Sequence, residues 1–134
     1  MAAVRDTILL IDDDPFFRTI LTDAFSEAGY TVVTAKDGVE GVEVFMDRSP
    51  AAVISDMIMP RMGGVSTCME IARLAGENPP VIVLLTSMIH GKAHEYQATQ
   101  MGAKVHIPKS TSPLDIVIIV EQLLTRDRFC RDEQ

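Results

Sequence analysis

Acidic, hydroxyl and amine side chains directly follow apolar runs at several places in this sequence. In chain order they are Asp12, Asp13, Asp14, Asp56, Thr86 and Lys109. Carboxylates gathered at one point bind protons or a hard cation such as Mg²⁺, and one of them can act as a nucleophile toward phosphorus. A lysine can hold a phosphoryl oxygen through a charge-assisted hydrogen bond. Together these residue types predict a site that carries one phosphoryl group on one aspartate.

The apolar pattern predicts the elements that must position these side chains. Continuous apolar runs rich in β-branched residues are typical of strands buried on both faces. Such runs cover 8–11, 31–35, 51–55, 81–85 and 104–107. Helices are expected after each run, with starts marked by Asp14–Pro15, by Asp37 with Glu40, and by Ser112–Pro113. A polar helix is expected over about 89–101, and the last helix over about 113–126.

Strands that alternate with helices predict an α/β fold with one parallel five-stranded sheet, because each strand returns to the sheet through a helix. Right-handed crossovers then put helices on both faces, which makes the sheet doubly wound. Ligand sites in open α/β sheets form beyond the carboxyl ends of the strands. The chemically active side chains stand at those ends, so we expect them to meet at one edge of the sheet.

Helical spacing also predicts which side chains are buried. Met46 and Met69 are expected on the core-facing sides of the second and third helices. The core face of the last helix is expected to contain Ile116, Ile119, Val120 and Leu123. Three more apolar residues, Val117, Ile118 and Leu124, would then form a surface for a homodimer or another protein partner.

Composition narrows the class of protein. The 134 residues include 12 Lys plus Arg and 19 Asp plus Glu, a net charge of −7, and 47% are hydrophobic. One domain is expected, with a core over about 6–126 and a C-terminal tail over 127–134, of which residues 128–134 are expected to be frayed. Excess negative charge argues against direct binding to nucleic acid or an anionic membrane. No signal peptide or segment of ~20 apolar residues is present, so a cytoplasmic protein is expected.

Several motifs together resemble the receiver domain of bacterial two-component response regulators, in the stand-alone, chemotaxis-regulator-like form. They are Ile8 to Pro15, Ile54 to Pro60, Met62-Gly63-Gly64, Leu85-Thr86-Ser87, and Gly102-Ala103 with Lys109. The resemblance covers about residues 6–126 and implies the flavodoxin-like strand order 2-1-3-4-5. It also implies phosphorylation by a sensor histidine kinase or phosphotransfer protein. The output would pass to an unknown protein through helix 4, strand 5 and helix 5.

The resemblance assigns a role to each matching residue. Asp56 matches the phosphoacceptor, and Asp12 and Asp13 match the acidic pair that holds Mg²⁺ together with Asp56 and the backbone carbonyl of Ile58. Thr86 matches the switch hydroxyl, and Lys109 matches the family's lysine. His106 stands where the family usually has a switch tyrosine or phenylalanine. Ile58 and Met88 occupy the positions that flank the hydrolytic water, where neither side chain can activate water, so slow autodephosphorylation is expected.

Two other functions remain open from the sequence. A haloacid-dehalogenase-like phosphatase would use Asp12 as its nucleophile, but Pro15–Phe16 fits that motif poorly and the chain lacks room for a later acidic motif. A phosphorylation-independent binding module would not need the complete acidic set. We expect a phosphoacceptor that promotes its own phosphotransfer, and no turnover enzyme. Asp14 is expected to cap a helix rather than to bind metal.

Overall fold

The computed structural model describes residues 6–57, 59, 62–86 and 105–132, with the backbone alone over 128–132. Five parallel strands form one sheet in the order β2-β1-β3-β4-β5, as expected. The strands are β1 (Thr7–Ile11), β2 (Thr31–Ala35), β3 (Ala52–Asp56), β4 (Val81–Thr86) and β5 (Val105–Pro108). The helices are α1 (Pro15–Glu27), α2 (Gly38–Arg48), α3 (Gly64–Ala75) and α5 (Pro113–Asp132). The helix expected over 89–101 lies outside the described residues.

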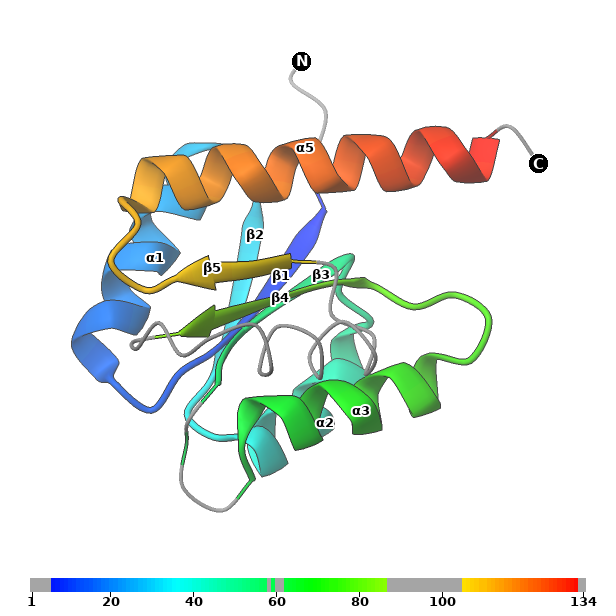
Figure 1. The fold of residues 1–134 in the computed structure, drawn as a ribbon, viewed down its shortest axis with the longest axis horizontal. Coiled ribbons are helices and arrows are strands. Elements are labelled where there is room, and N and C mark those ends of the chain that lie inside the picture. The colour runs from blue at the N-terminus through cyan, green and yellow to red at the C-terminus, as the bar shows by residue number, and fades with distance from the viewer. Residues whose placement is uncertain (1–5, 58, 60–61, 87–104, 133–134) are drawn as a thin grey trace.

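Helices cover both faces of the sheet, as a doubly wound fold requires. Figure 1 shows α1 and α5 on one face and α2 and α3 on the other. Successive strand residues alternate between the two layers. In β1, Ile8 and Leu10 pack in the core below α1 and α5, whereas Leu9 and Ile11 pack in the core beside α2 and α3. This alternation determines which face receives each polar side chain at the strand ends.

The predicted helix starts are confirmed. Asp14 caps α1, because its Oδ1 accepts hydrogen bonds from the backbone N–H groups of Phe16 and Phe17 at 3.0 and 3.4 Å. Asp37 caps α2 by accepting a bond from the N–H of Glu40 at 2.9 Å. These side chains satisfy N–H groups that have no partner inside the helix. The start of α1 is thereby fixed at Pro15, three residues after Asp12.

The prediction that Met46 and Met69 face the core is wrong. Their side chains are 64% and 48% exposed. On α2 the stripe that faces the sheet contains Gly38 and Gly41, both buried. A Cβ at Gly41 would lie 2.5 Å from Cδ1 of Ile11, so the helix packs on the sheet through a residue without a side chain. Glycine gives no hydrophobic signal, so helical periodicity does not find this part of the buried stripe.

The last helix is longer than expected, and its buried face is wider. It continues to Asp132, so the expectation of a frayed tail from residue 128 is wrong for 128–132, where no glycine or proline interrupts the helix. Ile116 and Val120 are buried as expected, and Ile119 and Leu123 are partly buried against the same core. Val117 and Leu124 are also buried, where exposure was expected. Leu114 and Ile118 are the large apolar side chains that α5 exposes within the part of the chain described here. A homodimer through α5 stays a prediction, and α5 exposes less apolar surface for it than expected.

Two further absences concern only the described residues. None of their helices is long and apolar enough to cross a membrane. None of their peptide bonds is cis, which includes the bonds around Pro108, Lys109 and Ser110.

Gly64, the first residue of α3, lies against the end of β3. A Cβ there would stand 2.2 Å from the backbone oxygen of Asp56 and 2.8 Å from Cα of Met57. Its N–H donates to the carbonyl of Met57 at 2.8 Å. Both close neighbours are backbone atoms, which cannot move aside by changing a rotamer. A side chain at this position must therefore displace the backbone that carries Asp56.

We expect Gly64→Ala to lower the free energy of unfolding by about 1–3 kcal/mol, because it overpacks a backbone contact. Gly63→Ala is the matched control, since a Cβ at Gly63 meets only the Met57 carbonyl oxygen at an ordinary 3.4 Å. Urea unfolding followed by circular dichroism measures both variants. Equal stability of the two variants would contradict the close packing of α3 on β3.

Candidate functional site

The register of the sheet places Asp12 beside Asp56. β1 and β3 pair in parallel with Leu10 opposite Ile54 and Ile11 opposite Ser55. One step further along both strands brings Asp12 opposite Asp56. Their side chains point to the same face of the sheet as Leu10 and Ile54, because strand residues alternate with a period of two. Both carboxyl groups are nearly buried, at 3% and 6% exposure.

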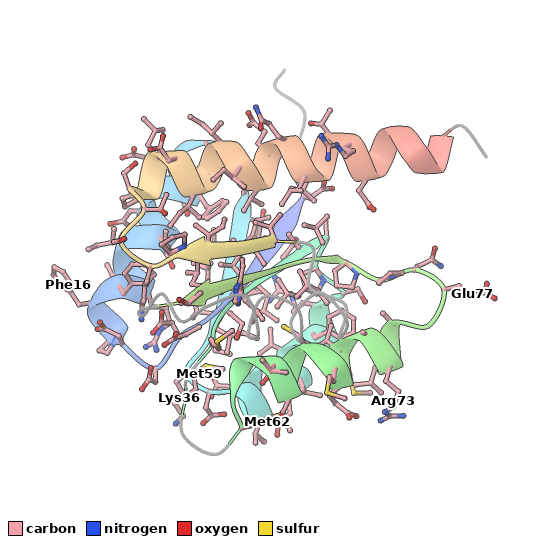
Figure 2. All side chains as sticks on the ribbon, in the orientation of Figure 1. Phe16, Lys36, Met59, Met62, Arg73 and Glu77 are labelled. Atoms are coloured by element: carbon pink, nitrogen blue, oxygen red, sulfur yellow. The ribbon has the colours of Figure 1, made fainter. Side chains whose placement is uncertain are left out.

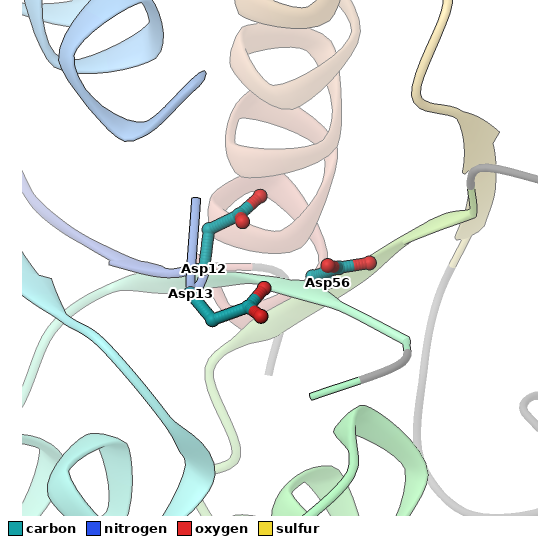
Figure 3. A group of neighbouring side chains, drawn as sticks. All are labelled: Asp12, Asp13 and Asp56. Carbon is teal, nitrogen blue, oxygen red and sulfur yellow. The ribbon is translucent and has the colours of Figure 1, made fainter. Parts of the chain in front are cut away.

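Asp13 completes an acidic cluster at the carboxyl edge of the sheet. Each of Asp12, Asp13 and Asp56 contributes a carboxylate oxygen, and these oxygens lie within 4.8 Å of one another. Figure 3 shows the three side chains gathered at the ends of two neighbouring strands. Asp13 is exposed, so the cluster opens to solvent on one side. Three convergent carboxylates open to water are the donor set that a hard divalent cation takes, so these residues fit a metal ion.

Lys109 supplies the positive charge at the cluster. Its Nζ lies 3.0 Å from Oδ2 of Asp12 and 3.3 Å from Oδ2 of Asp56. Burial lowers the pKa of Lys109. The hydrogen bonds to Asp12 and Asp56 and the charges of these carboxylates raise it by more than burial lowers it, so the pKa of Lys109 lies above the ordinary value. Lys109 therefore remains protonated and offsets two buried negative charges.

The start of α1 supports the acidic cluster through three contacts. The N–H of Asp14 donates to Oδ1 of Asp12 at 2.8 Å. The guanidinium of Arg18 donates to the carbonyl of Asp12 at 2.7 Å. The ring of Phe17 lies under the Lys109 ammonium, with Nζ 4.6 Å from the ring centroid. Sequence reasoning missed Arg18 and Phe17, although their place in the first turns of a helix that begins beside Asp12 could have indicated both.

Thr86 lies on β4, the strand next to Asp56, and His106 lies on β5, the edge strand beyond β4. Thr86 ends β4 opposite Pro108, and His106 pairs with Leu84 in β5. The N–H of Lys109 donates to the carbonyl of Thr86 at 2.6 Å, which extends the pairing of β4 and β5 to the lysine. The structure thus places Thr86 and Lys109 at the same edge as the acidic cluster. Ile58 and Met88 lie outside the described residues.

The arrangement can perform one kind of chemistry. Asp56 offers a carboxylate oxygen as a nucleophile, the acidic cluster can hold a cation beside it, and Lys109 can bind an anionic group that reaches Asp56. Asp14 takes no part in the cluster because its carboxylate caps α1, as expected. The site therefore suits transfer of a phosphoryl group to a carboxylate.

A family model described as the response regulator receiver domain matches residues 8–121. Among similar proteins, the response regulator MprA of Mycobacterium ulcerans is 32% identical over 126 residues, which are 94% of this chain and 53% of that protein. A probable transcriptional regulator, ycf27, of Cyanophora paradoxa is 33% identical over 122 residues, covering 91% of this chain and 49% of that protein. This chain spans about half the length of these two relatives.

Solved structures agree with the fold. The signal receiver domain of NarL from Mycobacterium tuberculosis superposes with a TM-score of 0.84 and 26% identity, covering 92% of this chain and 98% of that chain. The chemotaxis protein CheY4 of Vibrio cholerae gives a TM-score of 0.81 at 23% identity, over 87% of this chain and 96% of that chain. The second likeness supports the fold alone.

We expect Lys109→Gln to lower the free energy of unfolding by about 1–3 kcal/mol at neutral pH, because Asp12 and Asp56 lose their shared counter-charge. Adding Asp56→Asn to Lys109→Gln should recover part of that loss, since it removes one of the two facing carboxylates. Urea unfolding of the single and double variants in metal-free buffer measures both effects. Lys36→Gln, at an exposed position, is the control and should change stability by less than about 0.5 kcal/mol. A Lys109→Gln protein as stable as the wild type would contradict the role of Lys109 as counter-charge.

Proposed function

The chain belongs to the response regulator receiver domain family, and from this we propose that it is a signalling switch whose Asp56 accepts a phosphoryl group from a phosphohistidine. The observation that carries the proposal is that the nearly buried Asp56 carboxylate gathers with the Asp12 and Asp13 carboxylates and lies 3.3 Å from the Lys109 ammonium. The donor is a sensor histidine kinase or a phosphotransfer protein. The receiver core is residues 6–126, and the protein works in the cytoplasm.

The transfer follows from the residues at the site. An oxygen of the Asp56 carboxylate attacks phosphorus, an O–P bond forms, and the N–P bond of the donor breaks with its electron pair left on the imidazole nitrogen. Lys109 leaves its contact with Asp12 and holds a phosphoryl oxygen, which keeps the new group beside Asp56. Asp12, Asp13 and Asp56, with the Ile58 carbonyl, would hold Mg²⁺, which when bound would supply positive charge that offsets the charge of the phosphoryl group.

The output side of the proposal involves Thr86 and His106. Thr86 stands on the strand beside Asp56 and His106 on the next strand along, and a new dianionic group on Asp56 offers an acceptor to the Thr86 hydroxyl. Movement of Thr86 toward that group frees space for His106, which acts as the switch residue in place of a tyrosine or phenylalanine. The face that includes β5 and α5 then changes shape, and a protein partner binds one of its two states.

We propose a protein rather than a nucleic acid as the reader of this chain. The ycf27 relative is named a probable transcriptional regulator, but this chain matches only about half of it. The net charge of −7 disfavours contact between this chain and phosphate backbones.

Treatment with a small phosphodonor and Mg²⁺ should add the mass of one phosphoryl group to the wild type and none to Asp56→Asn. Intact-mass spectrometry measures the addition. Asp14→Asn is the matched control, because asparagine keeps the helix cap and the residue lies next to the cluster without joining it. It should be phosphorylated like the wild type.

The same experiment separates the alternatives. A phosphoryl group found on Asp12, or steady release of phosphate from the donor by Asp56→Asn, would point to a phosphatase that uses Asp12. An unmodified wild type would contradict the phosphoacceptor role. Asp13→Asn should be modified more slowly at limiting Mg²⁺, and a rate that does not depend on Mg²⁺ would contradict the metal-binding role of the cluster.

The phosphorylated protein should decay slowly, because the side chains at 58 and 88 are Ile and Met, which cannot orient or deprotonate water. This prediction rests on the sequence alone. The double variant Ile58→Asn with Met88→Glu should lose its phosphoryl group faster than the wild type by about tenfold or more. Loss of the phosphorylated mass over time gives both rates, and equal rates would refute the prediction.

Thr86→Ala and His106→Ala should accept the phosphoryl group but lose phosphorylation-dependent binding to the downstream protein, since both act after transfer. Co-precipitation with and without the phosphodonor compares them with wild type. Thr34→Ala, at an exposed position on β2, is the control and should bind normally. Full phosphorylation-dependent binding by both variants would show that Thr86 and His106 do not control binding of the downstream protein.

A further inference from the structure

Phe17 contacts the lysine of the site through the face of its ring. The Lys109 ammonium lies 4.6 Å from the centroid of the Phe17 ring. Its other described partners are the carboxylates of Asp12 and Asp56, at 3.0 and 3.3 Å. Lys109 is half-buried among these groups. Two anions and one aromatic face thus determine where the ammonium lies.

The ring itself is held in place by the fold. Phe17 is the third residue of α1 and packs against the core between α1, α5 and the sheet. Its own N–H donates to the Asp14 carboxylate, so the turn that carries it is capped. The adjacent residue, Arg18, is fixed to the Asp12 carbonyl. Phe17 therefore approaches Lys109 from a part of α1 that is tied to the acidic cluster.

A neutral ring and a carboxylate hold a lysine in different ways. When a cation or a phosphoryl group arrives, Asp12 and Asp56 gain other partners and their hold on Lys109 weakens. The ring takes up no other partner and continues to attract the ammonium. A lysine with four carbon atoms in its side chain would otherwise turn toward solvent, at a cost in conformational freedom when it must return.

We propose that Phe17 is a positioning residue that keeps the Lys109 ammonium next to Asp56 while the carboxylates change partners. This inference rests on the proposed function, because it names the residue that prepares Lys109 to hold the incoming phosphoryl group. Phe17 itself does not touch the reacting atoms.

The first test compares two neighbouring phenylalanines. Phe17→Leu keeps an apolar side chain but removes the ring, and should slow phosphorylation by a small phosphodonor about 3- to 10-fold. Phe16→Leu is the matched control, because Phe16 is 75% exposed and points away from the body of the protein (Figure 2). It should react at the wild-type rate. Phe17→Tyr restores a ring and should recover the rate, whereas equal rates for the two leucine variants would overturn the proposal.

A second test separates the ring's charge distribution from its size. Phenylalanine at position 17 is replaced by analogues with increasing numbers of ring fluorines, which weaken the attraction of the ring face for a cation. The phosphorylation rate should fall steadily along the series, while the melting temperature changes little. A rate that does not respond to fluorination would show that Phe17 acts only through packing and would overturn the proposal.

A third measurement keeps the inference apart from the proposed function. In metal-free buffer without phosphodonor, Phe17→Leu and Lys109→Met should be non-additive in urea unfolding, with the double variant losing less stability than the sum of the two. Additive losses would deny the contact and overturn the proposal. If the coupling is present but the wild type accepts no phosphoryl group, the proposed function fails, and the positioning role in transfer fails with it.

Discussion

Two carboxylates forced together by strand register are the constraint on which this structure depends. Parallel strands lie ~4.8 Å apart, and the pairing of β1 with β3 continues to Asp12 and Asp56, so their side chains project side by side from the sheet. Like charges at this separation, nearly buried, repel each other. The sheet cannot relieve the repulsion without losing its register, because a shift by one residue would turn every core side chain to the wrong face. The repulsion therefore favours a cation beside the two carboxylates.

Lys109 meets that need in the structure described here, and the rest of the site is arranged around it. The lysine comes from the loop after β5, at the far edge of the sheet, and reaches both carboxylates. The start of α1 holds the other side, through Asp14 and Arg18 on Asp12 and through Phe17 on the ammonium. Stability and reactivity are linked here, because a group that takes over as counter-charge releases the lysine for another task.

Much of this could be predicted because parallel strands bring their carboxyl ends together by geometry. Asp12, Asp56, Thr86 and Lys109 needed only the positions of four strand ends to be placed at one edge. Arg18 and Phe17 could not be found that way, because their contacts depend on how α1 packs over the loop. The faces of α2 and α5 are only partly predictable, since Gly41 carries no hydrophobic signal and the continuous apolar run of residues 116–120 in α5 offers several candidate stripes. Sequence periodicity records side-chain character and does not record close backbone approach.

The last hydrogen bond between β4 and β5 reduces the number of parts that can move independently. It joins the Lys109 N–H to the Thr86 carbonyl at 2.6 Å, so the backbone that carries the hydroxyl and the backbone that carries the amine are directly connected. Neither can be displaced far without straining or breaking that bond. A protein whose response involves both Thr86 and Lys109 then favours two distinct arrangements of these residues over a series of intermediate ones. As the fraction of modified molecules rises, the number of molecules in the second arrangement would rise with it. Each molecule would be in one arrangement or the other.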